Sequence, residues 1–154
     1  KISSTADVNA NALPARMQRP FTISASGLGA TPLYGFFIDA QPHNRIAIGF
    51  GAGRLSITSG TNTLGAIFVP VTAKLYLLDY AVSPFIEGGG TFVSLDLKSN
   101  TKLFRGTFDG VQPIAGGGIE YRAHFGLLVR AIAIRYFDAN IWAPGLSLGY
   151  AFQI

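Results

Sequence analysis

The strongest constraint on the fold of this 154-residue chain is the strict alternation of residue types along its last segment. From Trp142 to Ile154 the even-numbered residues are apolar and mostly large, whereas the odd-numbered residues are small or polar. Successive side chains of a β-strand point to opposite faces, so a period of two indicates a strand. The segment is therefore predicted to be a β-strand whose two faces meet different surroundings.

A similar division recurs in residues 45–53, 66–77 and 111–122, and in all four segments the charged residues lie opposite the continuous apolar row. Period-two patterning and turn-forming residues together predict eight strands, joined mostly by alternating short and long connections. The predicted strands are residues 21–30, 33–41, 44–57, 64–78, 82–97, 110–122, 125–137 and 142–154. Residues 1–19 lack the pattern and are expected to form a tail or N-terminal arm, with residues 20–154 forming the folded domain.

The composition is that of neither a soluble globule nor a helical membrane protein. Charged residues make up 13% of the chain and hydrophobic residues 49%, whereas a typical soluble protein has about 25% charged residues. The longest uncharged stretches, residues 20–38 and 55–73, are interrupted by glycine, proline or asparagine, which excludes a helical span of about 20 apolar residues. The sequence has no cysteine, which excludes a disulfide framework and a thiolate metal site.

The residues on the two strand faces indicate which face lines the interior of the barrel. The face with the glycines is too sparse in charge to solvate an exterior, and the opposite face is too bulky for a barrel of eight strands, whose interior is only just wide enough for side chains. Only helices and closed barrels satisfy every backbone group in hydrocarbon. The predicted fold is therefore all-β: an eight-stranded antiparallel up-and-down transmembrane β-barrel whose large apolar face meets lipid. A soluble lipocalin-like barrel has the same number of strands and is the alternative.

Aromatic residues are expected to form girdles at both rims of such a barrel. The candidates at the rim with short turns are Phe85, Tyr121, Phe125, Tyr150 and Phe152, and those at the rim with long loops are Phe92, Tyr136, Phe137 and Trp142.

Charged residues in three strands do not follow the pattern simply. Arg54 shares parity with an apolar row, so either the phase shifts just before it or it lies at the outer end of its strand. Glu87 also lies on an apolar row, and a bulge at residues 88–90 could reset the phase there. Arg130 and Arg135 have opposite parity, and we place Arg130 on the small-residue face and Arg135 near the far rim.

Three segments carry a resemblance to a known family: Pro144 to Phe152, Pro84 to Phe92 and Gly116 to Arg122. Over about residues 21–154 the chain resembles the small outer-membrane β-barrels of the OmpA/OmpX type. The resemblance implies a place in the bacterial outer membrane, contact with its lipid and lipopolysaccharide, and assembly by the barrel-assembly machinery. Such chains usually end on an aromatic residue, whereas here Phe152 stands two places before Ile154.

Four charged residues, Lys74, Glu120, Arg122 and Arg130, map to the lumen toward the short turns. They could form an ion-paired plug, or a charged constriction that selects or relays solutes. A narrow lumen is normally filled and buried charges need partners, which favours the plug. The expected function is therefore a structural, adhesive or interaction module with a plugged lumen, binding protein partners through its outer loops or N-terminal arm. A narrow channel or a lipid-binding transport barrel is the alternative.

Lys98, Lys102 and Arg105 lie on the longest expected loop, which should face outside. Lysine and arginine bind phosphate groups well, so these residues could contact lipopolysaccharide. An ordinary solvated loop is the equal alternative.

The sequence offers no recognisable catalytic, metal or cofactor site. Its two histidines, His43 and His124, both fall in short turns. Residues 129–136 faintly resemble the active-site strand of a lipid A deacylase, but the matching places hold Arg135 and Phe137. We expect no enzyme activity, no cofactor and no nucleic-acid partner, with a lipid-modifying enzyme as the least favoured alternative.

Overall fold

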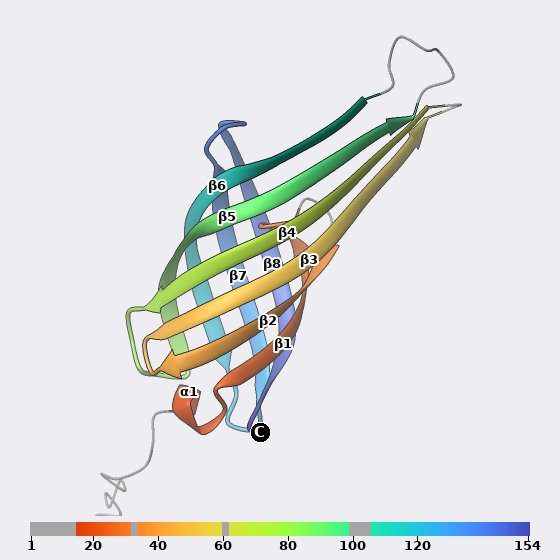
Figure 1. Ribbon diagram of the computed structural model, residues 1–154. Coiled ribbons are helices and arrows are strands. Elements are labelled where there is room, and N and C mark those ends of the chain that lie inside the picture. Colours follow the sequence, from red (N-terminus) through yellow and green to blue (C-terminus); the bar gives the residue numbers. More distant parts are fainter. Residues whose placement is uncertain (1–14, 32–33, 60–61, 99–105) are drawn as a thin grey trace, which may run out of the picture.

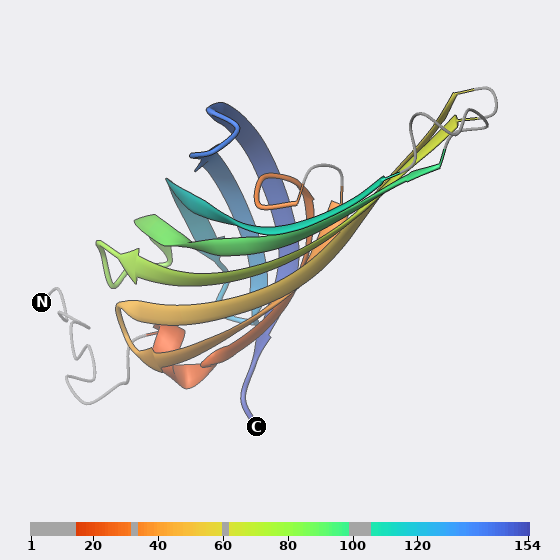
Figure 2. The ribbon, with the colours of Figure 1, turned by 45° about the horizontal axis from the view of Figure 1, so that its top comes forward.

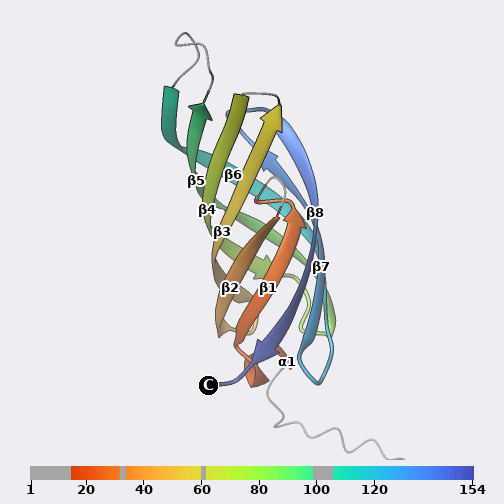
Figure 3. The same ribbon diagram turned by 90° about the vertical axis from the view of Figure 1, so that its right-hand side faces the viewer.

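The computed structural model describes residues 15–31, 34–59, 62–98 and 106–154. Eight strands pair with their sequence neighbours, all antiparallel, and β1 pairs with β8 to close a barrel (Figures 1 and 3). The strands are β1 (Phe21–Leu28), β2 (Tyr34–His43), β3 (Ile46–Ser59), β4 (Asn62–Tyr76), β5 (Val82–Lys98), β6 (Gly106–Arg122), β7 (Leu127–Tyr136) and β8 (Ile141–Phe152). This confirms the predicted all-β, up-and-down architecture.

A four-residue helix, α1 (Ala15–Gln18), precedes β1. It lies at the barrel end that carries the β2–β3, β4–β5 and β6–β7 connections, which we call the short-turn end; the opposite end is the long-loop end (Figure 1). Among the described residues no helix is long and apolar enough to cross a membrane.

The period-two pattern of the sequence matches the alternation of exposed and buried side chains along the strands. In β2 and β8, residues that point outward are apolar and exposed, such as Ile38 at 54% and Leu146 at 65%, whereas their neighbours along each strand are buried. Large exposed hydrophobic residues of this kind occur on every strand. A continuous apolar exterior is what a barrel needs to face lipid hydrocarbon.

Strands β3 to β6 are longer than the others and continue past the barrel rim at the long-loop end (Figures 1 and 2). Pairing of β3 with β2 stops at Arg54, but pairing of β3 with β4 continues to Ser59 and Asn62, and that of β5 with β6 to Leu97 and Gly106. We call this extension, residues 55–59, 62–66, 95–98 and 106–108, the β3–β6 arm. Much of what the sequence indicated as long loops is therefore paired strand.

The register resolves two of the irregular charged residues. Pairing of β3 with β4 keeps one register on either side of Arg54, which is exposed and lies where β2 ends, so no phase shift occurs there. Around Glu87 the β4–β5 and β5–β6 registers are also unbroken, so the expected bulge at residues 88–90 is wrong. Glu87 instead points inward together with Phe85 and Val93. In the β2–β3 pairing, by contrast, the register does shift, between Ala40 and His43.

Of three buried apolar clusters among the described residues, one, made of Ala66, Phe68 and Val93, lies where the β3–β6 arm begins, and two lie within the body of the barrel. One of these two lies toward the long-loop end and contains Ala30, Phe37, Ile114, Ile134 and Tyr136. The other, toward the short-turn end, contains Ala47, Tyr76 and Phe85. Phe85, at 2% exposure, and Tyr136, at 8%, therefore face the lumen and not the rims where we expected them. The other girdle candidates except the half-buried Phe152 are exposed.

Candidate functional site

Seven charged side chains are buried within the described part of the barrel. Four are the residues predicted to face the lumen, Lys74, Glu120, Arg122 and Arg130, each at most 3% exposed. The other three are Arg16, Asp39 and Glu87. We call these seven residues the lumen charge network; they bring four cations and three carboxylates into one low-dielectric space.

The pairing register of the strands places the partners of two ion pairs directly opposite each other. Lys74 lies directly opposite Glu87 in the β4–β5 pairing, and Glu120 lies directly opposite Arg130 in the β6–β7 pairing. Side chains at opposed positions point to the same face of a sheet and interact. Lys74 Nζ is 3.7 Å from Glu87 Oε2, and Arg130 Nη2 is 2.7 Å from Glu120 Oε2.

Glu120 is the most heavily bonded carboxylate of the network. Its Oε2 accepts hydrogen bonds from the Tyr76 hydroxyl at 2.6 Å and from Arg130, while Oε1 accepts from Arg122 Nη2 at 3.1 Å. Arg16 Nε lies 3.6 Å from the same Oε1. A fully buried carboxylate needs such partners, because desolvation of the charge is otherwise uncompensated.

Arg130 joins the two ends of the network. Besides Glu120, its Nη2 donates to Asp39 Oδ2 at 3.0 Å, an oxygen that also accepts from the Thr22 hydroxyl. Lys74 Nζ donates to the other oxygen, Asp39 Oδ1, at 2.6 Å. Asp39, Lys74, Arg130 and Glu120 therefore form a continuous chain of ion pairs across the lumen, in which each bond supports its neighbours.

Glycines in β3 make room for these contacts. In the register, Gly49 stands between Asp39 of β2 and Thr72 of β4. A Cβ on Gly49 would collide with Asp39 Oδ1 and would lie 2.6 Å from Lys74 Nζ. Gly51 likewise leaves space for the ring of Phe37. Gly49 and Gly51 therefore let large side chains of the neighbouring strands extend over β3.

The glycines of β6 have a different use. A Cβ on Gly116 would collide with the carbonyl oxygen of Ala133, and one on Gly118 with that of Ala131. Both carbonyls belong to the adjacent strand β7, so these glycines permit a close approach of two backbones. They differ in this from Gly49 and Gly51, which make space for side chains.

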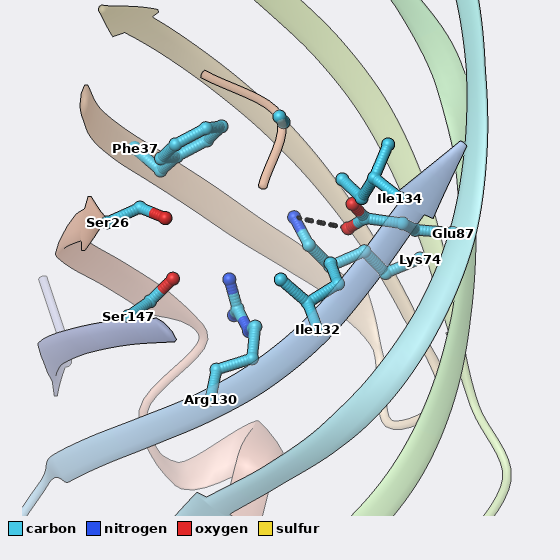
Figure 4. Close-up of a pocket in the computed structure, with 9 residues that line it drawn as sticks. Ser26, Phe37, Lys74, Glu87, Arg130, Ile132, Ile134 and Ser147 are labelled. Atoms are coloured by element: carbon cyan, nitrogen blue, oxygen red, sulfur yellow. Dashed lines mark ion pairs between the residues drawn. The ribbon is translucent and has the colours of Figure 1, made fainter. Parts of the chain in front are cut away.

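A small cavity adjoins the network on its long-loop side (Figure 4). Its volume is about 20 Å³, which is enough for about one water molecule. In Figure 4 the side chain of Lys74 points toward Glu87, with Ser26 and Ser147 on the opposite wall. Phe37 and Ile134 of the apolar cluster line the cavity on its other side.

The described part of the N-terminal segment contacts the barrel at its short-turn end. Arg16 is 2% exposed, and its Nη1 donates to the carbonyl of Leu78 at 3.0 Å. Its guanidinium carbon lies 4.4 Å from the centre of the Tyr76 ring. Burial lowers the pKa of the Arg16 guanidinium, and the charge of Glu120 opposes that shift. Arg122 donates to the carbonyl of Arg19 at 3.1 Å. Among the described residues of the segment, Arg16 and Arg19 therefore contact the barrel, although both precede residue 20.

Of the other candidate site residues, His43, His124 and Arg135 lie outside the lumen charge network. Lys98 is the last residue of β5, while Lys102 and Arg105 lie outside the described residues. His43 and His124 are exposed at the short-turn end, and Arg135 is half-buried near the end of β7, where it donates to Asn140. In the parts of the chain that the structure describes, no group of three or more histidine, aspartate or glutamate residues could hold a metal ion.

No protein-family model matches this chain, and no curated protein sequence matches it. Several solved structures of other proteins are similar to it. The N-terminal β-barrel domain of Pseudomonas aeruginosa OprF superposes with a TM-score of 0.70 at 17% identity, covering 88% of this chain and 98% of that domain. Neisserial surface protein A gives a TM-score of 0.57 at 9% identity, covering 87% and 94%.

A third similar structure is Ail, the attachment invasion locus protein of Yersinia pestis, solved in complex with the heparin analogue sucrose octasulfate. Its TM-score is 0.52 at 13% identity, with 86% of this chain and 95% of that chain covered. These neighbours are bacterial outer-membrane β-barrels, and the present chain is a closed eight-stranded barrel of the same fold. The likeness to small outer-membrane barrels that the sequence indicated is thereby confirmed at the level of the fold.

Proposed function

We propose that this outer-membrane barrel is closed, and that it acts as a structural, adhesive or interaction module and not as a conduit. The lumen charge network carries the proposal. Each of its carboxylates has a basic partner: Asp39 and Lys74 at 2.6 Å, Glu87 and Lys74 at 3.7 Å, Glu120 and Arg130 at 2.7 Å. A solute passing through would have to separate these pairs and leave buried charges unpaired, which is strongly unfavourable.

Two layers on either side of the network support closure. Toward the long-loop end lies the apolar cluster of Phe37, Ile114, Ile134 and Tyr136, whose side chains carry no charge that could replace the water around an ion. Toward the short-turn end lies Arg16 with its helix α1. The cavity between network and apolar cluster, at about 20 Å³, accommodates about one water molecule.

Ion flux from liposomes tests this proposal on the whole population of molecules. The barrel, refolded into liposomes loaded with an ion-sensitive dye, should release ions no faster than liposomes without protein. A rate that rises with the amount of barrel, and that changes in Glu120→Gln, would support the narrow-channel alternative and overturn the plug.

The β3–β6 arm favours a second role, as the contact surface of the module. It carries paired strands beyond the rim, at the end where Lys98 concludes β5. Ail, which shares the fold, was solved with a sulfated heparin analogue. We propose that Lys98, Lys102 and Arg105 bind polyanions such as the phosphates of lipopolysaccharide.

Binding to a lipopolysaccharide-coated surface tests this role. Replacing all three residues with glutamine should weaken binding, and Arg45→Gln, at the opposite end of the barrel, serves as the control. Equal binding by wild type and triple variant would refute the assignment. The proposal includes no catalytic step, so hydrolysis of lipid A by the purified barrel would also contradict it.

A further inference from the structure

The outer wall formed by β7, β8 and β1 carries an apolar groove near the short-turn end. Its volume is about 530 Å³, within the range of about 300–1,000 Å³ found for ligand sites. The residues that line it are Ile23, Leu127, Leu148, Gly149, Tyr150 and Phe152. Leu148 is 59% exposed and Tyr150 51%, so the groove opens toward the surroundings of the barrel and not into the lumen.

A basic residue stands at the end of this groove. The guanidinium carbon of Arg19 lies 6.0 Å from the centre of the Tyr150 ring, and its Nη1 donates to the Tyr150 hydroxyl at 3.3 Å and to the carbonyl of Phe125. A Cβ on Gly126, which has a φ of +109°, would collide with that Nη1. The glycine therefore provides the space in which the guanidinium is held against the β6–β7 turn.

The geometry leaves Arg19 able to bind another group. Its contacts to Phe125, Tyr150 and Ala151 all use Nη1, whereas a guanidinium has five N–H donors in a planar fork that also matches a phosphate. The residue is half-buried, so part of its side chain is accessible from outside the barrel. Arg45, at the same end of the barrel, differs because it forms a salt bridge with Asp79 at 3.2 Å.

We propose that Arg19 and this groove together bind one phospholipid of the membrane leaflet on the short-turn side. An acyl chain would lie in the apolar groove and the lipid phosphate on the guanidinium. Tyr150 and Phe125 would sit at headgroup depth, where aromatic residues of transmembrane barrels concentrate. The inference rests on the barrel's placement in a membrane, and it commits to a lipid because a free phosphate would use Arg19 but gain nothing from the groove.

Native mass spectrometry of the full chain, released from lipid nanodiscs containing phosphatidylethanolamine and phosphatidylglycerol, tests the site. The wild type should retain one phospholipid through delipidation steps that remove the remaining lipid. Arg19→Gln should weaken retention about tenfold, since it removes a charge-assisted hydrogen bond. Leu148→Trp, which fills the groove, should weaken it as well, whereas Arg45→Gln should match the wild type.

Equal retention by Arg19→Gln and Arg45→Gln would overturn the proposal. Displacement of the bound species by inorganic phosphate would also overturn it, in favour of a free-anion site, and an unaffected Leu148→Trp would remove the groove from the site. Heat-modifiable migration on gels shows for each variant that the barrel is folded. Failure of the membrane placement is distinguishable, because the folded barrel would then stay soluble without detergent.

Discussion

Lys74 and Asp39 form an ion pair across an intervening strand. Nζ of Lys74, on β4, is 2.6 Å from Oδ1 of Asp39, on β2, and β3 runs between them. The side chains meet because the residue of β3 at that level, Gly49, has no Cβ. The Lys74–Asp39 ion pair therefore depends on a position that carries no side chain at all.

Gly49→Ala should destabilise the barrel, because its new methyl group would press on both partners of the ion pair. We expect the free energy of unfolding to fall by about 1–3 kcal/mol, the usual cost of overpacking. Gly88→Ala is the matched control, since its Cβ would come no closer than 3.8 Å to the carbonyl oxygen of Ile114. Urea unfolding in lipid vesicles, followed by the fluorescence of Trp142, measures the free energy of unfolding of both variants. Equal decreases in the two would argue against the contact of Lys74 with Asp39 over Gly49.

Glu120→Gln should lower the free energy of unfolding more than Gly49→Ala does. The substitution keeps the shape of the side chain but removes the charge that faces Arg122 and Arg130. Breaking a buried pair in this way destabilises proteins by about 3–5 kcal/mol. Asp79→Asn breaks an exposed pair with Arg45 and should cost less than about 1 kcal/mol. The same unfolding assay decides, and similar small losses in both variants would mean that the network is not desolvated.

The membrane boundary can be tested with two isoleucines of nearly equal exposure. Ile38, in the middle of β2, is 54% exposed, and Ile57, in the β3–β6 arm, is 52% exposed. An arginine on the lipid face of a transmembrane barrel costs about 2–4 kcal/mol at mid-depth. Ile38→Arg should lower stability in vesicles by this amount and Ile57→Arg by much less. The reverse order would place the arm, and not the barrel body, in the membrane.

Sequence patterning was sufficient for the strands and for much of the network. A period of two defines which residues share a face, and a glycine-rich face can only be the inner one in a narrow barrel. Lys74, Glu120, Arg122 and Arg130 all lie on such faces, which is why they could be assigned to the lumen. Asp39 could have been assigned in the same way, since it alternates with the exposed Phe36 and Ile38.

Where both faces of a strand are apolar, parity gives no direction. Phe85 and Tyr136 were expected at the rims because large apolar residues were equated with lipid contact, yet they fill the interior. Glu87 then seemed to need a bulge, although it simply shares the inner face with Phe85. The interior of the barrel takes both kinds of side chain: Phe85 packs with Tyr76 beside the charged residues, and Tyr136 packs in the apolar cluster toward the long-loop end.

Contacts between strands that are not neighbours could not be predicted at all. Whether Asp39 reaches Lys74 depends on the stagger and tilt with which eight strands close, and a strand pattern does not contain this information. Arg16 lies outside any periodic segment, so the sequence carries no signal that its side chain enters the barrel. Barrel closure, which brings these groups together, is a property of the assembled sheet.

Single-channel recording in planar bilayers tests the closed lumen most directly. The wild-type barrel, inserted and folded, should give no resolved current steps, because ion-paired side chains and an apolar layer fill the path. Steps that are present in the wild type, and whose size changes in Glu120→Gln, would show that ions pass the network and would contradict the account.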